Sequence, residues 1–298
     1  RVAAKIGGYT GGVALTAQDV AKRKRPRDLT AYDLFQLGLE AKHRATREGL
    51  VEAIRLLNES VAIDPGFARA YTALAWAYDM QSGFVDDTPE QVAQRLALAQ
   101  RAVALDPADA EAHAALASML GNTGDLVRSE AENEKALALN PNSADILIFY
   151  ALWASSYGKA DKGVAAAEQS LRLNPNMPDW SLRAYRYAYF MAGRYADALR
   201  FMDRMPQEML NRGDRVFRAA ILAALGRDQD AQAEVAQTLA LFPALTIEGF
   251  AVLDPGWAEA ERQRLIETMR KAGFPACARA DLFKDRPETR RLPECASA

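Results

Sequence analysis

The feature that most constrains the fold of this chain is a repeat with a period of 34 residues. Asp-Pro or Asn-Pro pairs end at Pro65, Pro107, Pro141 and Pro175, and the last two intervals are both 34 residues long. The first interval is 42 residues, which is the same period with an eight-residue insertion. A fixed period of about 20 to 50 residues predicts a stack of similar supersecondary units.

Each proline closes a stretch that is typical of the second helix of a helix pair. The similar stretches span residues 60–65, 102–107, 136–141 and 170–175, with a looser copy at 238–243. Proline has no N–H and disfavours helical geometry in the residue before it, so the helix is expected to end there. Asp109 and Ser143 follow as polar caps that would start the next helix.

Small residues recur at fixed positions of this period. Gly124, Gly158 and Gly226 fall between the two helices of a pair, where a tight turn is needed. Other small residues mark places where helices must approach closely: Ala75, Ala117, Ala151 and Ala219 on first helices, and Ala53, Ser129, Gly163 and Ala231 on second helices. Arg95 departs from the pattern, because it stands where a small residue is expected.

These residues resemble the tetratricopeptide repeat (TPR) consensus, most strictly over 110–175. The resemblance implies an all-α superhelical solenoid of about six helix pairs with a C-terminal capping helix. We therefore divide the chain into an N-terminal helical linker (1–27), a TPR array (28–245), C-terminal capping helices (246–275) and an irregular tail (276–298). Within the third part, residues 255–272 predict an amphipathic helix that would cover the end of the solenoid.

The flanks of the array carry a closer resemblance. Residues 24–38 are similar to the start of the TPR region in bacterial class III adenylate/guanylate cyclases, and residues 265–275 are similar to its terminal helix. Some transmembrane winged-helix regulators share this arrangement. The chain starts with Arg1, so we expect a fragment or processed product whose parent carries an effector domain upstream. The resemblance implies the sensory or regulatory part of a signalling protein, with the periplasmic side of a membrane slightly favoured.

Composition argues against several other functions. The net charge of −2 gives no general attraction to nucleic acid, and the longest apolar stretch (146–154) is about half of what a membrane span needs. His43 and His113 lie far from the two cysteines, unlike the spacing of zinc ligands. The glycines at 7–8 and 11–12 lack the Lys-Ser/Thr partner of a phosphate-binding loop. We expect no nucleic-acid binding, no membrane span, no metal, no cofactor and no catalytic residue.

Cys277 and Cys295 are the only cysteines, and both lie in the tail. They could close one loop as a disulfide, which would indicate an oxidising compartment. Two free thiols would suit a cytoplasm equally well, so the sequence leaves both alternatives open.

The resemblance also predicts a binding surface, because the first helices of TPR pairs line a concave groove. Counting along those helices places ten residues there: Phe35, Leu39, Arg69, Trp76, Asp79, Asn122, Ile148, Leu152, Arg186 and Tyr189. A mixed apolar groove of this kind suits an extended or helical peptide that is held by aromatic anchors. A homodimerisation scaffold and a free-standing assembly adaptor are the alternative functions.

One segment is unusually aromatic: Trp180, Tyr185, Tyr187, Tyr189 and Phe190 fall within eleven residues. They exceed one buried stripe of a helix, so we expect some of them to be exposed in the groove or at an interface.

Overall fold

A computed structural model describes residues 21–22, 29–82, 88–177, 179–254, 257–284, 286 and 288–296, with only the backbone of residues 180 and 208. The predicted linker (1–27) lies outside the described residues, apart from two helical residues at 21–22. Across these described ranges every regular element is helical and no strand occurs.

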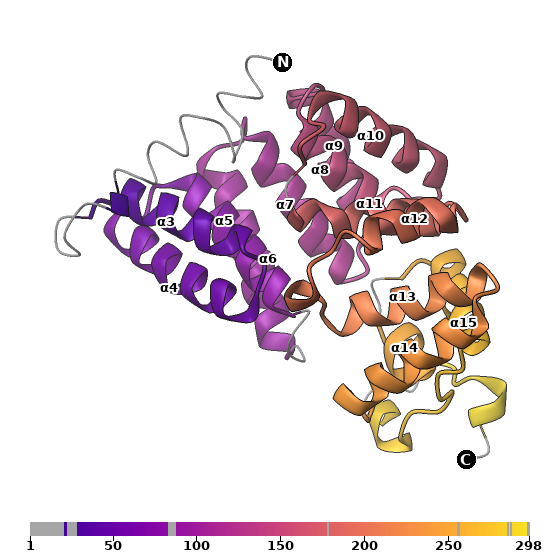
Figure 1. The fold of residues 1–298 in the computed structure, drawn as a ribbon. Helices are drawn as coiled ribbons and strands as arrows, with labels where there is room; N and C mark the ends of the chain where they lie inside the picture. The colour runs from indigo at the N-terminus through magenta and orange to yellow at the C-terminus, as the bar shows by residue number, and fades with distance from the viewer. Residues whose placement is uncertain are drawn as a thin grey trace.

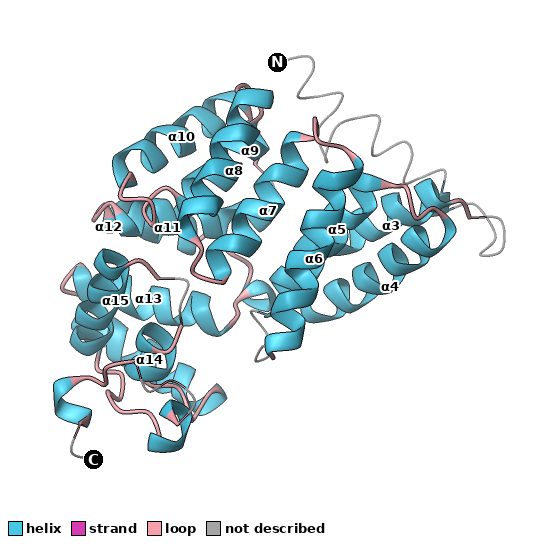
Figure 2. Cartoon of the chain, turned by 180° about the vertical axis from the view of Figure 1, so that it is seen from behind, coloured by secondary structure: helices cyan, strands magenta, loops and turns pink. Residues whose placement is uncertain are grey.

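Within the described residues, six helix pairs follow one another (Figure 1). They are α3 (Ala31–His43) with α4 (Arg47–Ile63), α5 (Ala68–Ser82) with α6 (Pro89–Leu105), α7 (Ala110–Asn122) with α8 (Leu126–Leu139), α9 (Ala144–Trp153) with α10 (Ala160–Leu173), α11 (Leu182–Met191) with α12 (Tyr195–Met202), and α13 (Arg212–Ala224) with α14 (Asp228–Leu241). Helix α15 (Glu259–Ala272) packs on α13 and follows the last pair. The pairs form an arc from α3 to α15, which Figure 2 shows from behind.

Short 3-10 and π-helical segments lie between some of these helices and in the tail. They are η2 (Asp179–Ser181), η3 (Gln207–Met209), η4 (Glu248–Val252), η5 (Ala280–Phe283) and η6 (Pro293–Cys295).

The turns inside the pairs use the predicted glycines. Gly124, Gly158 and Gly226 have φ values of 83°, 72° and 74°, a left-handed conformation that favours glycine. Gly193 makes the same turn between α11 and α12 with a φ of 75°, although the sequence pattern is too weak there to identify it. The predicted caps are also confirmed for Asp109 and Ser143, whose side chains accept backbone N–H groups at the starts of α7 and α9.

Small residues let the helices approach closely, as predicted. Ala75, Ala117 and Ala219 have no exposed surface at all. Gly121 on α7 shows how close the contact is, because a Cβ atom built there would overlap the ring of Trp153 on α9. The indole Nε1 of that tryptophan donates to Ser118 Oγ at 2.8 Å, so α7 and α9 are joined by both packing and a hydrogen bond.

The aromatic cluster on α11 is more deeply buried than expected. The four members with described side chains are Tyr185, Tyr187, Tyr189 and Phe190, and none is more than 7% exposed. Their ring partners come from α12 (Phe201), from α13 (Phe217) and from the segment before α15 (Trp257). Because helices cover α11 on several sides, the expectation of exposed aromatics is wrong for Tyr185, Tyr189 and Phe190, whereas Tyr187 lines the groove described below. The side chain of Trp180 lies outside the described residues.

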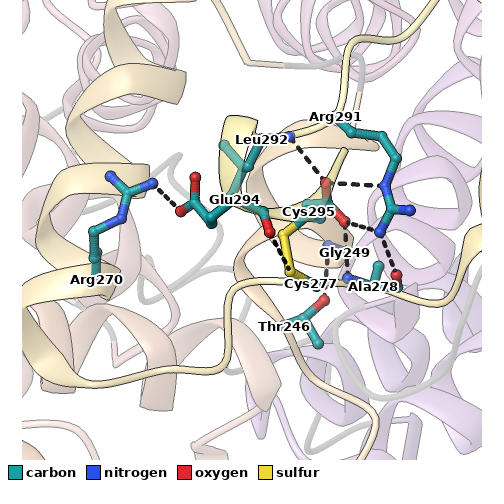
Figure 3. The surroundings of a disulfide bond; sticks show 10 residues. Thr246, Gly249, Arg270, Cys277, Ala278, Arg291, Leu292, Glu294 and Cys295 are labelled. Carbon is teal, nitrogen blue, oxygen red and sulfur yellow. Dashed lines mark hydrogen bonds and ion pairs between the residues drawn. A yellow bond between two sulfur atoms is a disulfide. The ribbon is translucent and has the colours of Figure 1, made fainter. Parts of the chain in front are cut away.

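The C-terminal tail is fastened to η4 rather than loose (Figure 3). Glu248 has no exposed surface, and its carboxylate accepts the backbone N–H groups of Ala278 and Leu292, each at 2.9 Å. Arg291 pairs with the same carboxylate at 3.0 Å. A disulfide joins Cys277 to Cys295 beside this cluster, with a Cα–Cα distance of 5.3 Å.

Candidate functional site

The structure contains a groove of about 920 Å³ along the inside of the arc. All six first helices contribute to it, from α3 through α5, α7, α9 and α11 to α13. Of the second helices in the described part of the chain, α6 alone lines it. Its C-terminal end is formed by η4, Trp257 and two tail residues, Leu282 and Arg286. The groove is therefore bounded by the repeats along its length and by the capping segment at one end.

Five of the ten predicted groove residues line this groove: Trp76, Asp79, Asn122, Leu152 and Arg186. Asn122 Nδ2 donates to Asp79 Oδ1 at 2.6 Å, and Arg95 Nε lies 4.0 Å from the same oxygen. Arg95 was not predicted as a groove residue, although a large side chain at a position where the repeat has a small one indicated an unusual role. The large side chain at a small-residue position reaches Asp79 and brings α6 to the groove wall.

The other five predicted residues lie elsewhere, which corrects the count along their helices. Phe35, Leu39 and Ile148 are each 1% exposed, and Tyr189 is 4% exposed, so all four belong to the hydrophobic core. Phe35 packs on Phe67 at 4.9 Å between ring centroids, and Tyr189 stacks on Phe201 of α12 at 5.4 Å.

These four core residues face the neighbouring helices because an amphipathic helix buries most of its apolar surface there. Arg69 is exposed, and its guanidinium lies 5.7 Å from the ring centroid of Phe35 instead of in the groove.

Apart from Trp76, the aromatic residues of the groove differ from those predicted. Tyr187 lines it, two residues before Tyr189, together with Phe217, Phe250 and Trp257. The ring of Trp257 lies 6.0 Å from the rings of both Tyr187 and Phe250. The sequence showed a dense aromatic segment on α11 but gave no sign that residues near 250 fold back against it.

Glu261 holds the capping helix against this wall. Its carboxylate accepts hydrogen bonds from Ser156 Oγ at 2.8 Å, from Tyr187 Oη at 2.9 Å and from Ser155 Oγ. It also caps its own helix by accepting the backbone N–H of Ala258 at 3.1 Å. Burial, and then the neighbouring Glu261, raise the pKa of Tyr187 well above its usual value, so its hydroxyl stays protonated and donates.

Two buried cations line opposite ends of the groove. Lys42 on α3 is 7% exposed, and burial lowers its pKa to about 8 even though Glu111 and Asp145 favour the charged form. Arg186 on α11 is 5% exposed, and its guanidinium carbon lies 4.0 Å from the ring centroid of Phe217. Burial lowers the pKa of Arg186 to about 10, so the side chain is still a cation at neutral pH.

The carboxylate nearest to Arg186 is Asp214, which also serves Arg183. Arg183 Nε donates to Asp214 Oδ2 at 2.9 Å, whereas Arg186 Nη2 lies 3.4 Å from Asp214 Oδ1. Asp214 also accepts the backbone N–H of Asn211 at 3.1 Å and so caps α13. The start of α13 thereby sets the position of both arginines in the wall.

Among the described residues, no group of three or more His, Cys, Asp or Glu side chains is placed to hold a metal ion. His113 is fully buried, with Nδ1 2.5 Å from Glu132 Oε2 and Nε2 3.0 Å from the carbonyl oxygen of Pro107. This is the environment of a histidine that is part of the folded core. Within the same described part of the chain, no helix has the length and apolar character of a membrane span.

Comparison with known proteins places the fold. No family model matches the chain, and no curated protein matches its sequence. Among solved structures, the APC/C hetero-tetramer Cut9-Hcn1 has a TM-score of 0.55 at 13% identity, covering 91% of this chain and 47% of that chain. The chain thus spans about half the length of that structure, and at this identity the likeness concerns the fold alone.

Two further structures are described as TPR proteins. One, from Thermus thermophilus, has a TM-score of 0.46 at 22% identity and covers 65% of this chain and 92% of its own. The other, from Parabacteroides merdae, has a TM-score of 0.43 at 15% identity and covers 86% of this chain and 96% of its own. The fold that the repeat predicted, an all-α TPR solenoid, is confirmed.

Proposed function

We propose that this chain is a non-catalytic protein–protein interaction module that binds an extended or helical polypeptide segment in its concave groove. The observation that supports this proposal is the groove of about 920 Å³ with aromatic residues from separate repeats in its wall. Large aromatic side chains in a partly formed groove are the usual anchors of peptide recognition, because they bury much surface with little loss of conformational freedom.

The residues that would contact the ligand are those that line the groove. We assign this role to Trp76, Asp79, Asn122, Leu152 and Arg186, together with Tyr187 and Trp257. Phe35, Leu39, Ile148 and Tyr189 would act indirectly, because they hold the first helices in place from behind.

The test is a selection of peptides from a random-sequence library, followed by affinity measurements on two matched variants. Leu152→Glu places a charge in the groove, whereas Val127→Glu places the same charge on α8, where the native side chain is 81% exposed. We expect the selected peptides to lose about tenfold or more in affinity for the first variant and to bind the second like the native chain.

Equal affinities for the two variants, or a library that yields no binder, would contradict the proposal. Light scattering on the same samples tests the homodimer alternative: a stable dimer that Leu152→Glu dissociates would assign the groove to a second copy instead.

We also propose a signalling parent for this module, on sequence grounds alone. The resemblance of residues 24–38 and 265–275 to the TPR region of bacterial class III cyclases and of transmembrane winged-helix regulators supports it. The module would then be the sensory or regulatory part, and the disulfide between Cys277 and Cys295 suits an oxidising compartment. The reading frame upstream of residue 1 tests this: a cyclase or winged-helix domain is expected, and an unrelated domain would refute it.

A further inference from the structure

Arg186 is a buried cation with unused hydrogen-bonding capacity. Only 5% of its surface is exposed, and it lines the groove. Within the described part of the chain, its Nε and Nη1 atoms have no hydrogen-bond acceptor. Buried N–H groups nearly always have a partner, so a guanidinium in this state lacks something that it is built to bind.

The carboxylate beside Arg186 does not supply that partner. Asp214 gives one oxygen to Arg183 and to the N–H of Asn211, and its other oxygen is 3.4 Å from Arg186 Nη2. Two arginines therefore share one carboxylate, which leaves an excess positive charge at this point of the wall.

Basic residues also outnumber acidic ones among the described residues that line the groove. Six basic side chains line it, namely Lys42, Arg95, Arg183, Arg186, Arg212 and Arg286, whereas the acidic ones are Asp79 and Asp254. Some of these cations have partners within the chain, as Arg95 and Lys42 do. The balance is nonetheless opposite in sign to the net charge of −2 for the whole chain. A groove in which one sign of charge predominates between apolar walls concentrates ligands of the other sign.

The surroundings of Arg186 indicate which groups must lie beside the negatively charged group of the ligand. Its guanidinium stacks on Phe217, and Tyr187, Phe250 and Trp257 form the adjoining wall. An acceptor that reaches Arg186 must therefore be flanked by apolar or aromatic groups. Because the cations are spread from α3 to the tail, a single terminal carboxylate would meet only one of them, whereas carboxylates along a chain would meet several.

We propose that the groove takes an acidic polypeptide segment and that Arg186 binds an Asp or Glu side chain of that segment. The apolar residues next to this side chain would pack on Phe217 and Trp257. Arg183 is a positioning residue, because it orients Asp214, while the Nε and Nη1 atoms of Arg186 remain for the ligand. This inference rests on the proposed function and names the chemical class of its partner.

The experiment uses three pools of fluorescein-labelled peptides of about twelve residues, random in Trp, Leu and Ser plus one of Glu, Gln or Lys, all with amidated C-termini. For the native chain we expect the Glu pool to bind about tenfold more tightly than the Gln pool, and the Lys pool to bind least. The affinity for the Glu pool should fall as salt rises, and that for the Gln pool should stay nearly constant.

Two arginine variants locate the effect. Arg186→Met should remove the preference for Glu over Gln, so that this variant binds the two pools with equal affinity. Arg200→Met is the matched control, because that side chain is 75% exposed on α12 and the groove does not include it. The salt dependence of the native chain keeps the test valid even if Arg186→Met fails to fold.

The possible failures are distinguishable. Equal affinities for the Glu and Gln pools would overturn the acidic ligand and leave the proposed function standing. An undiminished preference in Arg186→Met would overturn the role of Arg186. Tighter binding of the Gln pool with free rather than amidated C-termini would assign the site to a terminal carboxylate. If no pool binds, the proposed function fails as well, and a dimer that Arg186→Met dissociates would give the face to a second copy.

Discussion

The middle repeats and the C-terminal cap of this molecule are held together by different forces. We use the term C-terminal cap for η4, α15 and the tail, residues 246–296. In the middle repeats, α7 to α10, the contacts are between close neighbours and mostly apolar, as with Gly121 against Trp153. In the cap, two buried carboxylates, Glu248 and Glu261, accept hydrogen bonds from residues that lie up to 44 and 106 positions away in the sequence, respectively.

This difference has a thermodynamic consequence. A solenoid repeat contributes stability through its own packing and through its interface with the next repeat, so the energy is spread over many small contacts. A buried carboxylate with several donors concentrates stability in one group, because losing it leaves every donor unpaired. We therefore expect single substitutions to have larger effects in the cap than in the repeats.

The largest effect should come from Glu248→Ala. This change leaves Arg291 and two backbone N–H groups without their acceptor, so the free energy of opening should fall by about 3–5 kcal/mol in residues 246–296. Amide hydrogen exchange measures this opening locally.

Glu259→Ala is the control on the neighbouring helix, because that side chain is 75% exposed and should contribute less than about 0.5 kcal/mol. An equal loss for both variants would contradict the claim that the stability of the cap is concentrated in its buried carboxylates.

The next effect should come from the disulfide. Replacing Cys277 and Cys295 by alanine opens a loop with a sequence separation of 18 residues, and this should lower the stability of the cap by about 3 kcal/mol. Denaturation of the native chain with and without reductant should show the same difference, while the double variant should be insensitive to reductant. If reductant changes nothing in the native chain, the tail is held without the bond.

In the repeats we expect a smaller effect from Gly121→Ala. The added methyl group would overlap the buried ring of Trp153, which should destabilise α7 to α10 by about 1–3 kcal/mol and leave the cap unchanged. Gly66→Ala is the control, because that glycine is exposed in the turn before α5 and its nearest neighbour is the Asp64 side chain at 3.3 Å. Hydrogen exchange that changes in the cap instead would show that the two regions are not independent.

The smallest effect should be the pH dependence of Lys42. Burial lowers its pKa to about 8, below the value of the unfolded chain, so the folded state releases its proton first as pH rises. The free energy of unfolding, measured by denaturant titration, should therefore increase by roughly 1 kcal/mol between pH 7 and pH 9, relative to a Lys42→Met variant at the same pH values. Parallel curves for the two proteins would mean that Lys42 is hydrated in solution.

The repeats could be predicted from the sequence because their determinants are local. Proline ends a helix wherever it stands, and Gly124 makes a left-handed turn for reasons that involve only its own backbone. The six helix pairs follow from such signals, repeated at a fixed period.

The capping helix could be predicted from its amphipathic pattern, but the contacts that hold the cap and half of the groove could not, because their determinants are long-range. Nothing near Glu261 in the sequence distinguishes it from a solvated helix carboxylate, since its partners Ser156 and Tyr187 come from other repeats. Likewise, the sequence of α11 does not decide whether Tyr187 or Tyr189 lines the groove. The contact of Trp257 with Tyr187, which decides it, joins residues that are far apart in the sequence.

The central claim is that the concave face, made by the first helices, is the recognition surface. Amide hydrogen exchange of the chain with and without a saturating selected peptide tests this most directly, because it reports on every helix at once. The account predicts slower exchange in α5, α7, α9 and α11 on binding, with no change in α4, α8 and α14. Protection confined to α4, α8 and α14 would contradict it.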